Sequence, residues 1–191
     1  MQARTRRDVP APDPLIAAAP YGPVVKSAHS DLGLGTATFS ADDRYRFRLS
    51  RVWDPSGPRI CFVMLNPSTA DELVLDPTVR RCATFAQAWG AGALEVTNCF
   101  ALRSTDPAAL RQVDDPVGDG NDEAIVAAAR DADSVVVAWG VRATYRGRED
   151  HVAALLREAG IDAVCLRRTR RGHPGHPLYL PNASTRIPWP G

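Results

Sequence analysis

Lysine is almost absent from this sequence. Lys26 is the only lysine, and the other 22 of the 23 cationic side chains are arginines. Arginine carries a planar fork of donors that suits phosphate, but a GC-rich gene gives the same bias and is the simpler explanation. The formal net charge is +1, so the overall charge neither indicates nor excludes an acidic partner such as a nucleic acid.

Cysteine motifs that bind metals are absent as well. The chain has four cysteines but no CxxC pair. Three of them, Cys61, Cys99 and Cys165, lie in apolar runs, where a free cysteine behaves as a small hydrophobic residue. The sequence also has no P-loop, no GxGxxG after a strand, no GxSxG elbow and no cysteine in a marked catalytic environment. We therefore expect neither a metal ion nor a cofactor.

Long hydrophobic runs are missing too. No apolar stretch approaches the roughly 20 residues that cross a bilayer, and the N-terminus has no apolar signal region. These absences predict a cytoplasmic protein without a membrane partner. Hydrophobic residues make up 45% and charged residues 24% of the 191 residues, which is typical of a globular domain with a full core. Residues 1–22 are rich in Pro, Ala and Arg and predict a flexible arm, which leaves residues 23–191 for a single domain.

Hydropathy patterns predict an α/β fold. Apolar and charged residues alternate over Arg44 to Asp54, and with TATFS before it this segment predicts an N-terminal antiparallel hairpin. From residue 59 onward apolar strands alternate with helices, the first of which starts with Asp76 as N-cap and Pro77. The strands are expected over residues 59–65, 93–102, 134–140 and 161–166, and the helices over 76–90, 121–130 and 148–160. The alternation predicts a three-layer α/β/α arrangement around a central, mainly parallel sheet of about four strands.

Polar side chains follow the apolar runs where the predicted strands end. In a parallel sheet the ligand site lies at the carboxyl ends of the strands. Those ends are Asn66-Pro67-Ser68-Thr69, Asn98-Cys99-Phe100, Trp139-Gly140 and Arg167 to His176. Proline favours extended backbone before it, so Asn66 would project from a stiff strand end, although Asn-Pro and Ser-Thr also form ordinary turns. A buried amide such as Asn98 needs a partner, which is either a neighbouring loop or a ligand such as a pyrimidine edge.

The segment RRTRRGHPGHPLYLP, residues 167–181, is the least ordinary stretch. Four arginines precede two His-Pro pairs in it. These residues are Arg167, Arg168, Arg170, Arg171, His173 and His176. Such a charge run is either a solvated loop or, beside a strand end, a clamp for phosphates. A histidine there can donate a hydrogen bond to a developing anion or move a proton, whereas zinc is disfavoured because no cysteine or carboxylate stands at ligand spacing.

Taken together, these motifs resemble the uracil-DNA glycosylase superfamily. In that superfamily an Asx-Pro turn follows the first strand, a later strand ends in a base-reading Asn, a strand of the type VFLLWG comes next, and a loop of the type HPSPL supplies a histidine. The corresponding stretches here are MLNPST (64–69), LEVTN (94–98), VVVAWG (135–140) and HPGHPL (173–178), in the same order. The combination of MLNPSTAD with GHPGHPLY also resembles a bacterial family defined by these motifs.

The resemblance implies two catalytic roles. Asn66 would position the attacking water, and either His173 or His176 would stabilise the departing base as an anion. Breaking an N-glycosidic bond builds positive charge on the sugar and negative charge on the base, which a donor at the base and a water below the sugar would stabilise.

The resemblance also implies binding roles. Asn98 would read the edge of a flipped base, with Phe100 or Trp53 stacked on it. The base pocket would be shaped by Pro67, Ser68 and Thr69. DNA would be held by Arg167, Arg168, Arg170 and Arg171, with Leu178 and Tyr179 as wedge candidates.

We therefore expect a monofunctional DNA N-glycosylase. It would flip a damaged or modified base, such as a phage-type base, out of the DNA stack and hydrolyse its N-glycosidic bond without a metal ion, in DNA repair or phage defence. The alternative is a non-catalytic relative that binds nucleic acid or nucleotides, or a nucleoside hydrolase on the same scaffold. Salt dependence separates DNA binding from a free-nucleoside site, because a DNA complex held by arginines weakens steeply with salt, whereas nucleoside binding does not.

Overall fold

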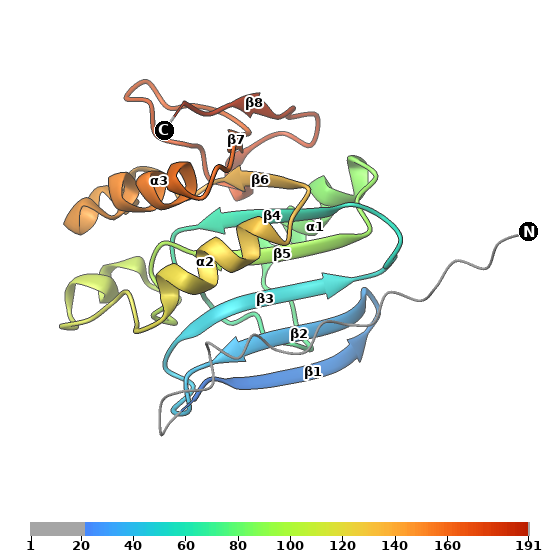
Figure 1. The fold of residues 1–191 in the computed structure, drawn as a ribbon, viewed down its shortest axis with the longest axis horizontal. Coiled ribbons are helices and arrows are strands. Elements are labelled where there is room, and N and C mark those ends of the chain that lie inside the picture. Colours follow the sequence, from blue (N-terminus) through green and yellow to red (C-terminus); the bar gives the residue numbers. More distant parts are fainter. Residues whose placement is uncertain (1–21, 191) are drawn as a thin grey trace, which may run out of the picture.

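The centre of the protein is an eight-stranded mixed sheet (Figure 1). The structure is a computed structural model that describes residues 22–190, so the predicted flexible arm lies outside the described residues except for its last residue. The strand order across the sheet is β1-β2-β3-β5-β4-β6-β7-β8. The strands are β1 (Val24–Ser30), β2 (Gly33–Phe39), β3 (Arg46–Val52), β4 (Arg59–Met64), β5 (Ala93–Asn98), β6 (Ser134–Val137), β7 (Val164–Cys165) and β8 (Ile187–Pro188).

Helices connect the strands from β4 onward. The helices are α1 (Pro77–Ala88), α2 (Asn121–Arg130) and α3 (Arg148–Glu158), with shorter 3₁₀ helices η2 (Pro107–Arg111), η3 (Val141–Gly147) and η4 (Pro177–Tyr179). The predicted start of α1 is confirmed, because Asp76 caps it by accepting the Val79 amide at 2.8 Å and Pro77 occupies the first position. In the part of the chain that the structure describes, no helix has the length and apolar character needed to cross a membrane.

The predicted fold class was wrong. Sequence analysis placed an antiparallel hairpin beside a mainly parallel sheet of about four strands in an α/β/α arrangement, whereas the structure has one continuous mixed sheet. Four of its strand pairings, β1–β2, β2–β3, β3–β5 and β7–β8, are antiparallel, and three are parallel. The physical reason is that β3 pairs directly with β5, with Leu49 opposite Val96. Alternation of apolar and charged residues predicts a half-exposed strand, but it does not reveal which strand lies beside it.

The individual elements after residue 59 lie close to their predicted positions. The helices begin and end within two residues of the expected bounds. The strands are shorter than expected: β5 ends at Asn98 and β6 at Val137, short of the expected residues 102 and 140, and only Val164–Cys165 of the expected 161–166 pairs as β7. Its partner β8 comes from the C-terminal segment, which carries no apolar run long enough to predict a strand.

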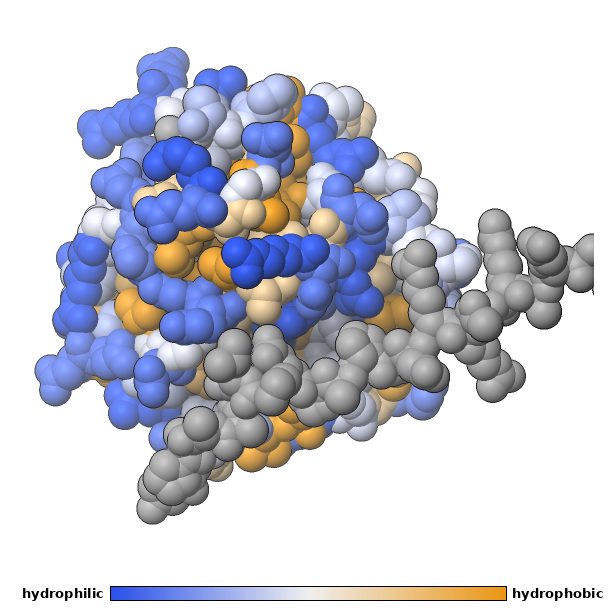
Figure 2. Space-filling model, in the orientation of Figure 1, coloured by the Kyte–Doolittle hydropathy of each residue, from blue (hydrophilic) through white to orange (hydrophobic). Residues whose placement is uncertain are grey.

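Helices cover both faces of the central strands. α1 packs on one face through Phe85, whereas α2 and α3 pack on the other face through Ile125 and Val152. Successive residues of β4 serve the two cores, with Phe62 in the first and Val63 in the second. The face of the molecule on this side is largely hydrophilic, with apolar patches between the charged residues (Figure 2).

The chain changes direction across the sheet at β4. It passes from β4 through α1 to β5 on one side, and from β5 through α2 to β6, which pairs with the other side of β4. Where two such connections diverge, a crevice opens at the carboxyl ends of the strands. The loops that follow β4 and β6 therefore border the place where sheets of this kind ordinarily bind a ligand.

Candidate functional site

A cavity of about 550 Å³ lies at the carboxyl ends of β4 and β6. Its walls come from the loop after β4, the start of α1, the loop after β5, the loop after β6 and the η4 segment, with one side chain from β3. A volume of this size is typical of small-molecule sites. Segments that are far apart in the sequence therefore meet around one hollow.

Asn66, one of the site residues expected from the sequence, lines this cavity. Its side-chain amide nitrogen donates to the carbonyl oxygen of Pro67 at 3.0 Å and to that of Ser104 at 2.9 Å. These bonds fix the orientation of the amide and occupy both of its N–H donors. Within residues 22–190 the Oδ1 of Asn66 has no hydrogen-bond partner, so it is the part of the side chain that remains to accept a bond from water or a ligand.

The other residues of the predicted Asn-Pro-Ser-Thr turn divide between the cavity and its support. Ser68 lines the cavity. Pro67 is buried, and its carbonyl also accepts the backbone N–H of Ser104 at 2.8 Å. Thr69 is exposed and does not line the cavity. The turn is thus anchored to the loop after β5 and presents only its asparagine and serine to the hollow.

His176 is the histidine that lines the cavity. It caps η4, because its Nδ1 accepts the Leu178 amide at 3.4 Å. Burial lowers the pKa of His176 from its ordinary value, and the nearby Asp76 carboxylate opposes that shift. The ring is therefore neutral at neutral pH, and with Nδ1 accepting, the proton sits on Nε2. The side chain can donate from Nε2 without carrying a charge.

His173 lies elsewhere, although it stands in the same loop. Its Nδ1 contacts Oε2 of Glu149, on α3, at 2.6 Å. Both side chains are largely buried, with 18% and 11% of their surface exposed. His173 does not line the cavity, so of the two histidines left open by the sequence, the structure brings only His176 to Asn66.

Asn98 and Phe100 do not reach the cavity. Asn98 is 1% exposed, and Phe100 is fully buried against Tyr145 with ring centroids 6.1 Å apart. The physical reason is the position of β5 between β3 and β4, with α2 covering its end. There Asn121, at the start of α2, donates to the carbonyl oxygen of Asn98 at 3.0 Å. The roles of base reader and stacking aromatic therefore do not fall on these two side chains.

Arg46 lines the cavity and was not predicted from the sequence. Its guanidinium donates to the Ala70 carbonyl at 2.7 Å and to Oδ1 of Asn98 at 3.4 Å. Burial lowers the pKa of Arg46 to about 10, so it stays charged at neutral pH. The alternating pattern of β3 assigned this arginine to a solvent face, but the loop after β4 covers that face and leaves Arg46 only 1% exposed.

Trp139, at the end of the VVVAWG strand, also lines the cavity. Its indole ring is 1% exposed and meets Trp189 edge-on at 5.1 Å between ring centroids. Within the described residues, the indole N–H has no hydrogen-bond partner. The Nε of Arg46 is buried without a partner in the same way. Unpaired buried donors are uncommon and costly, so these two side chains that line the cavity each carry a buried donor that the described residues do not satisfy.

Residues 46–178, more than half of the chain, match the family described as "Protein of unknown function (DUF1643)". The chain belongs to the DUF1643 family. No curated protein and no solved structure matches the chain. The match begins at the first residue of β3 and includes every residue that lines the cavity except Tyr179. The family description names no activity, so the resemblance to uracil-DNA glycosylases stays a prediction.

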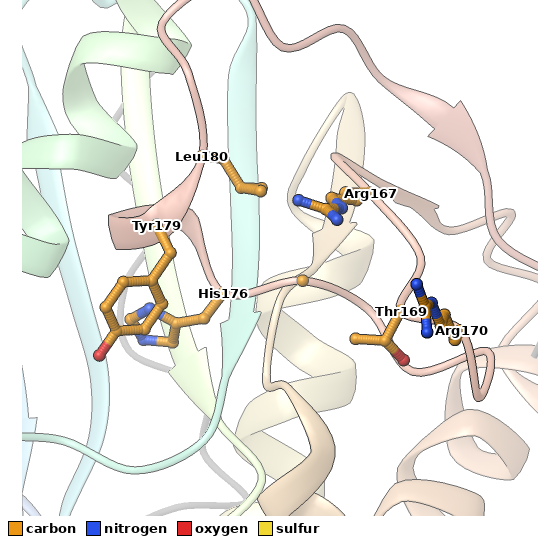
Figure 3. A pocket seen from close by; sticks show the side chains of 7 residues that line it. Arg167, Thr169, Arg170, His176, Tyr179 and Leu180 are labelled. Atoms are coloured by element: carbon orange, nitrogen blue, oxygen red, sulfur yellow. The ribbon is translucent and has the colours of Figure 1, made fainter.

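A smaller cavity of about 290 Å³ adjoins the larger one in this DUF1643 protein. The two share His176 and Tyr179, whose rings lie 5.6 Å apart between centroids (Figure 3). Arg167 and Arg170 line the smaller cavity, and all four arginines of the predicted run are exposed. Among the described residues, the only side-chain hydrogen bond that these four make is from Arg168 to the Pro188 carbonyl at 3.3 Å.

The predicted wedge residues stand at the rim of the larger cavity. Leu178 is 42% exposed and Tyr179 is 80% exposed, and both line the cavity. Proteins that bind single-stranded nucleic acid use exposed aromatic rings to stack on bases and arginines to contact phosphates.

The cysteines of the DUF1643 chain are not prepared to act as nucleophiles. Between residues 22 and 190, no three His, Cys, Asp or Glu side chains are grouped closely enough to hold a metal ion. All four cysteines are buried, and burial raises the pKa of Cys61, Cys82, Cys99 and Cys165. A nucleophilic cysteine needs the opposite shift, so none of the four thiols is activated as a nucleophile.

Proposed function

We propose that this protein hydrolyses the N-glycosidic bond of a damaged or modified base in DNA. The observation that carries the proposal is that Asn66 and His176 line one cavity at the switch point of the sheet. The bond to be broken lies between a sugar carbon and a base nitrogen, so the reaction needs a positioned water on one side and a hydrogen-bond donor on the other.

Asn66 would supply the positioned water. Its N–H donors are held by the carbonyls of Pro67 and Ser104, which leaves Oδ1 to accept one hydrogen of a water molecule. An amide cannot remove a proton, so it orients the water but does not activate it as a base. The reaction proposed here is therefore one in which the departing base leaves readily and the sugar develops its positive charge before the water bonds to it.

His176 would stabilise the departing base. As the bond between C1′ and the base nitrogen breaks, its electron pair stays on the base. The Nε2–H of a neutral His176 donates a hydrogen bond to that developing anion. The water oxygen then bonds to C1′, and its released proton passes to bulk solvent or to the base. The lowered pKa of His176 suits this role, because the neutral imidazole donates this hydrogen bond without first taking up a proton.

The surface beside the cavity supports DNA as the carrier of the base. Arg167 and Arg170 line the smaller cavity across from His176, without a carboxylate partner among the described residues, and Tyr179 stands exposed at the rim (Figure 3). A flipped nucleotide in the larger cavity would place its neighbouring phosphates near these arginines.

One observation favours a second candidate, in which the protein binds a nucleotide or nucleic acid without cleaving it, or hydrolyses a free nucleoside. The cavity holds no carboxylate in the position of a water-activating base at the end of β4, where Asn66 stands instead. A binding protein needs only the recognition groups, and a nucleoside hydrolase would not need the arginines.

The test uses oligonucleotides that each carry one damaged or modified base, offered as single and double strands. Abasic product is measured by strand cleavage in alkali. We expect product from at least one oligonucleotide and a loss of about 10²-fold or more in Asn66→Ala and in His176→Ala. The matched control is His29→Ala, because His29 is exposed on β1 at the far edge of the sheet.

Two results would contradict the proposal. One is the absence of product across the panel while the protein binds the same oligonucleotides, which favours the binding candidate. The other is full turnover by Asn66→Ala and His176→Ala. Product from free nucleosides but not from DNA would assign the protein to the nucleoside hydrolases.

A further inference from the structure

Two opposite charges line the larger cavity without touching one another. Arg46 comes from β3, and Asp76 caps α1. They are 1% and 8% exposed. Within residues 22–190, no ion pair of 4.0 Å or less joins them. The negative charge of Asp76 nevertheless raises the pKa of Arg46 against the larger effect of burial, so the two groups are near enough to interact.

Each of these charges has hydrogen-bonding capacity that the protein does not use. The guanidinium of Arg46 has five N–H donors, and it donates only to the neutral oxygens of Ala70 and Asn98. The Oδ1 of Asp76 accepts the Val79 amide, whereas Oδ2 accepts no hydrogen bond from the described residues. A buried charge without a partner is costly. A ligand that forms hydrogen bonds with both groups would therefore gain binding free energy.

We propose that Arg46 and Asp76 together read the hydrogen-bonding edge of the ligand, and that this ligand is a base carrying an exocyclic amino group beside a ring-nitrogen or carbonyl acceptor. Arginine donates to such acceptors and a carboxylate accepts from the amino group. The identification of the ligand as a base rests on the proposed function. The reading edge then comes from β3 and α1, and not from Asn98, which supports Arg46 from behind.

A purely structural role does not account for the pair. Arg46 does hold the loop after β4, but Arg51 already holds that loop by donating to the Asp71 carbonyl at 2.6 Å. Arg51 does not line the cavity, whereas Arg46 does. Capping of α1 uses Oδ1 of Asp76, and Oδ2 remains free to accept a hydrogen bond from a ligand.

Asp76→Asn is the most informative variant. Asparagine is as good an N-cap as aspartate, so its Oδ1 still accepts the Val79 amide and α1 keeps its start. The second oxygen becomes an NH₂ group, which turns an acceptor into a donor. The variant should therefore lose the preference for an amino-bearing base, because an NH₂ group cannot accept a hydrogen bond from the amino group.

The experiment measures equilibrium binding of free cytosine and free uracil, and of adenine and purine, by calorimetry. For the unmodified protein we expect the amino-bearing member of each pair to bind about tenfold or more tightly. Asp76→Asn should lose the preference for cytosine, because its NH₂ group cannot accept from the amino group, while Arg46 still faces the ring nitrogen, which is itself a donor in uracil. Asp76→Ser keeps a capping oxygen but loses the second one, and it should show no preference. Asp54→Asn is the matched control, because Asp54 is an exposed aspartate before β4, at the opposite end of that strand from Asn66.

Equal binding of both members of each pair by the unmodified protein would overturn the inference. So would an unchanged preference in a folded Asp76→Asn protein, with folding checked by circular dichroism. If neither Asp76 variant folds, the comparison of bases on the unmodified protein decides alone. Binding requires no turnover, so a clear preference without any abasic product would refute the proposed hydrolysis and leave the reading pair standing.

Discussion

His173 and His176 occupy the same His-Pro loop, yet they belong to different parts of the molecule. The backbone from 167 to 175 folds back on itself, with the Gly175 amide donating to the Arg167 carbonyl at 2.7 Å. This turn directs His173 to Glu149 on α3 and His176 to the cavity beside the start of α1. Two histidines that look equivalent in sequence thus have different partners, one a carboxylate and the other an open hollow.

This difference gives His176 a role in the proposed reaction and His173 a role in stabilising the fold. His173 is bonded to a buried carboxylate and has no access to the cavity. His176 keeps its Nε2 unused in the cavity that Asn66 shares. An experiment in which His173 affects turnover and His176 affects stability would contradict this assignment.

The largest expected difference is in turnover. His176→Ala should lower the rate of abasic-product formation by about 10²- to 10⁴-fold, because it removes the donor to the departing base. His173→Ala should change that rate by less than about tenfold, since the imidazole is absent from the cavity. Single-turnover kinetics on the best oligonucleotide measure both. An equal loss in the two variants would mean that the loop acts as a unit and that the distinction fails.

The next difference is in stability, where His173→Ala should have the larger effect of the two variants. His173→Ala leaves the largely buried Glu149 without its 2.6 Å partner, which should lower the free energy of unfolding by about 1–3 kcal/mol. His176→Ala removes only a long bond to the Leu178 amide and should cost about 1 kcal/mol or less. Urea unfolding followed by circular dichroism compares them. A greater loss in His176→Ala would assign the structural role to the wrong histidine.

The pH dependence of stability gives a further contrast. Burial lowers the pKa of His176 below its ordinary 6.5, so the unfolded chain binds a proton more readily than the folded protein. The stability contributed by keeping this ring neutral is therefore present above pH 6.5 and is lost as the pH falls below it. His176→Gln should remove up to about 1.4 kcal/mol per pH unit of that slope. Melting curves between neutral and mildly acidic pH test this, and identical slopes would contradict it.

The smallest expected effect concerns the arginines around the two histidines. Arg167 and Arg170 line the smaller cavity beside His176, whereas Arg171, next to Gly172, lines neither cavity. Replacing the first two by alanine should reduce the salt dependence of DNA binding by about one unit of log-log slope for each phosphate that an arginine no longer neutralises. Arg171→Ala is the matched control and should change it less. Equal changes would mean that the run is a diffuse basic surface.

The sequence predicted the local elements of this fold better than their assembly. Cap and breaker residues such as Asp76 and Gly90 mark the ends of α1 directly, because these signals act on their own backbone. The pairing of β3 with β5 depends on contacts between distant segments, and no local pattern encodes it. For that reason the mixed sheet was predicted as a parallel one with a separate hairpin.

The candidate site shows the same division. Asn66, Ser68 and His176, which line the cavity, have a signal in the sequence because each stands where a strand or loop ends, and such ends gather at one edge of a parallel segment. Asn98 has the same local signal but lies under α2 in the core. Arg46 had no signal, since only the folded loop after β4 shows that an arginine of an alternating strand is buried. Burial by a distant segment is what the sequence alone did not reveal.

The most direct test of the central claim follows the four histidine rings by proton–carbon NMR while an oligonucleotide with an abasic-site analogue and a free base are added. His→Ala variants assign the four signals. The account predicts that the His176 signal shifts with saturation, while those of His29 and His151 stay in place and that of His173 moves little. A saturable shift of His173 with His176 unchanged would contradict it.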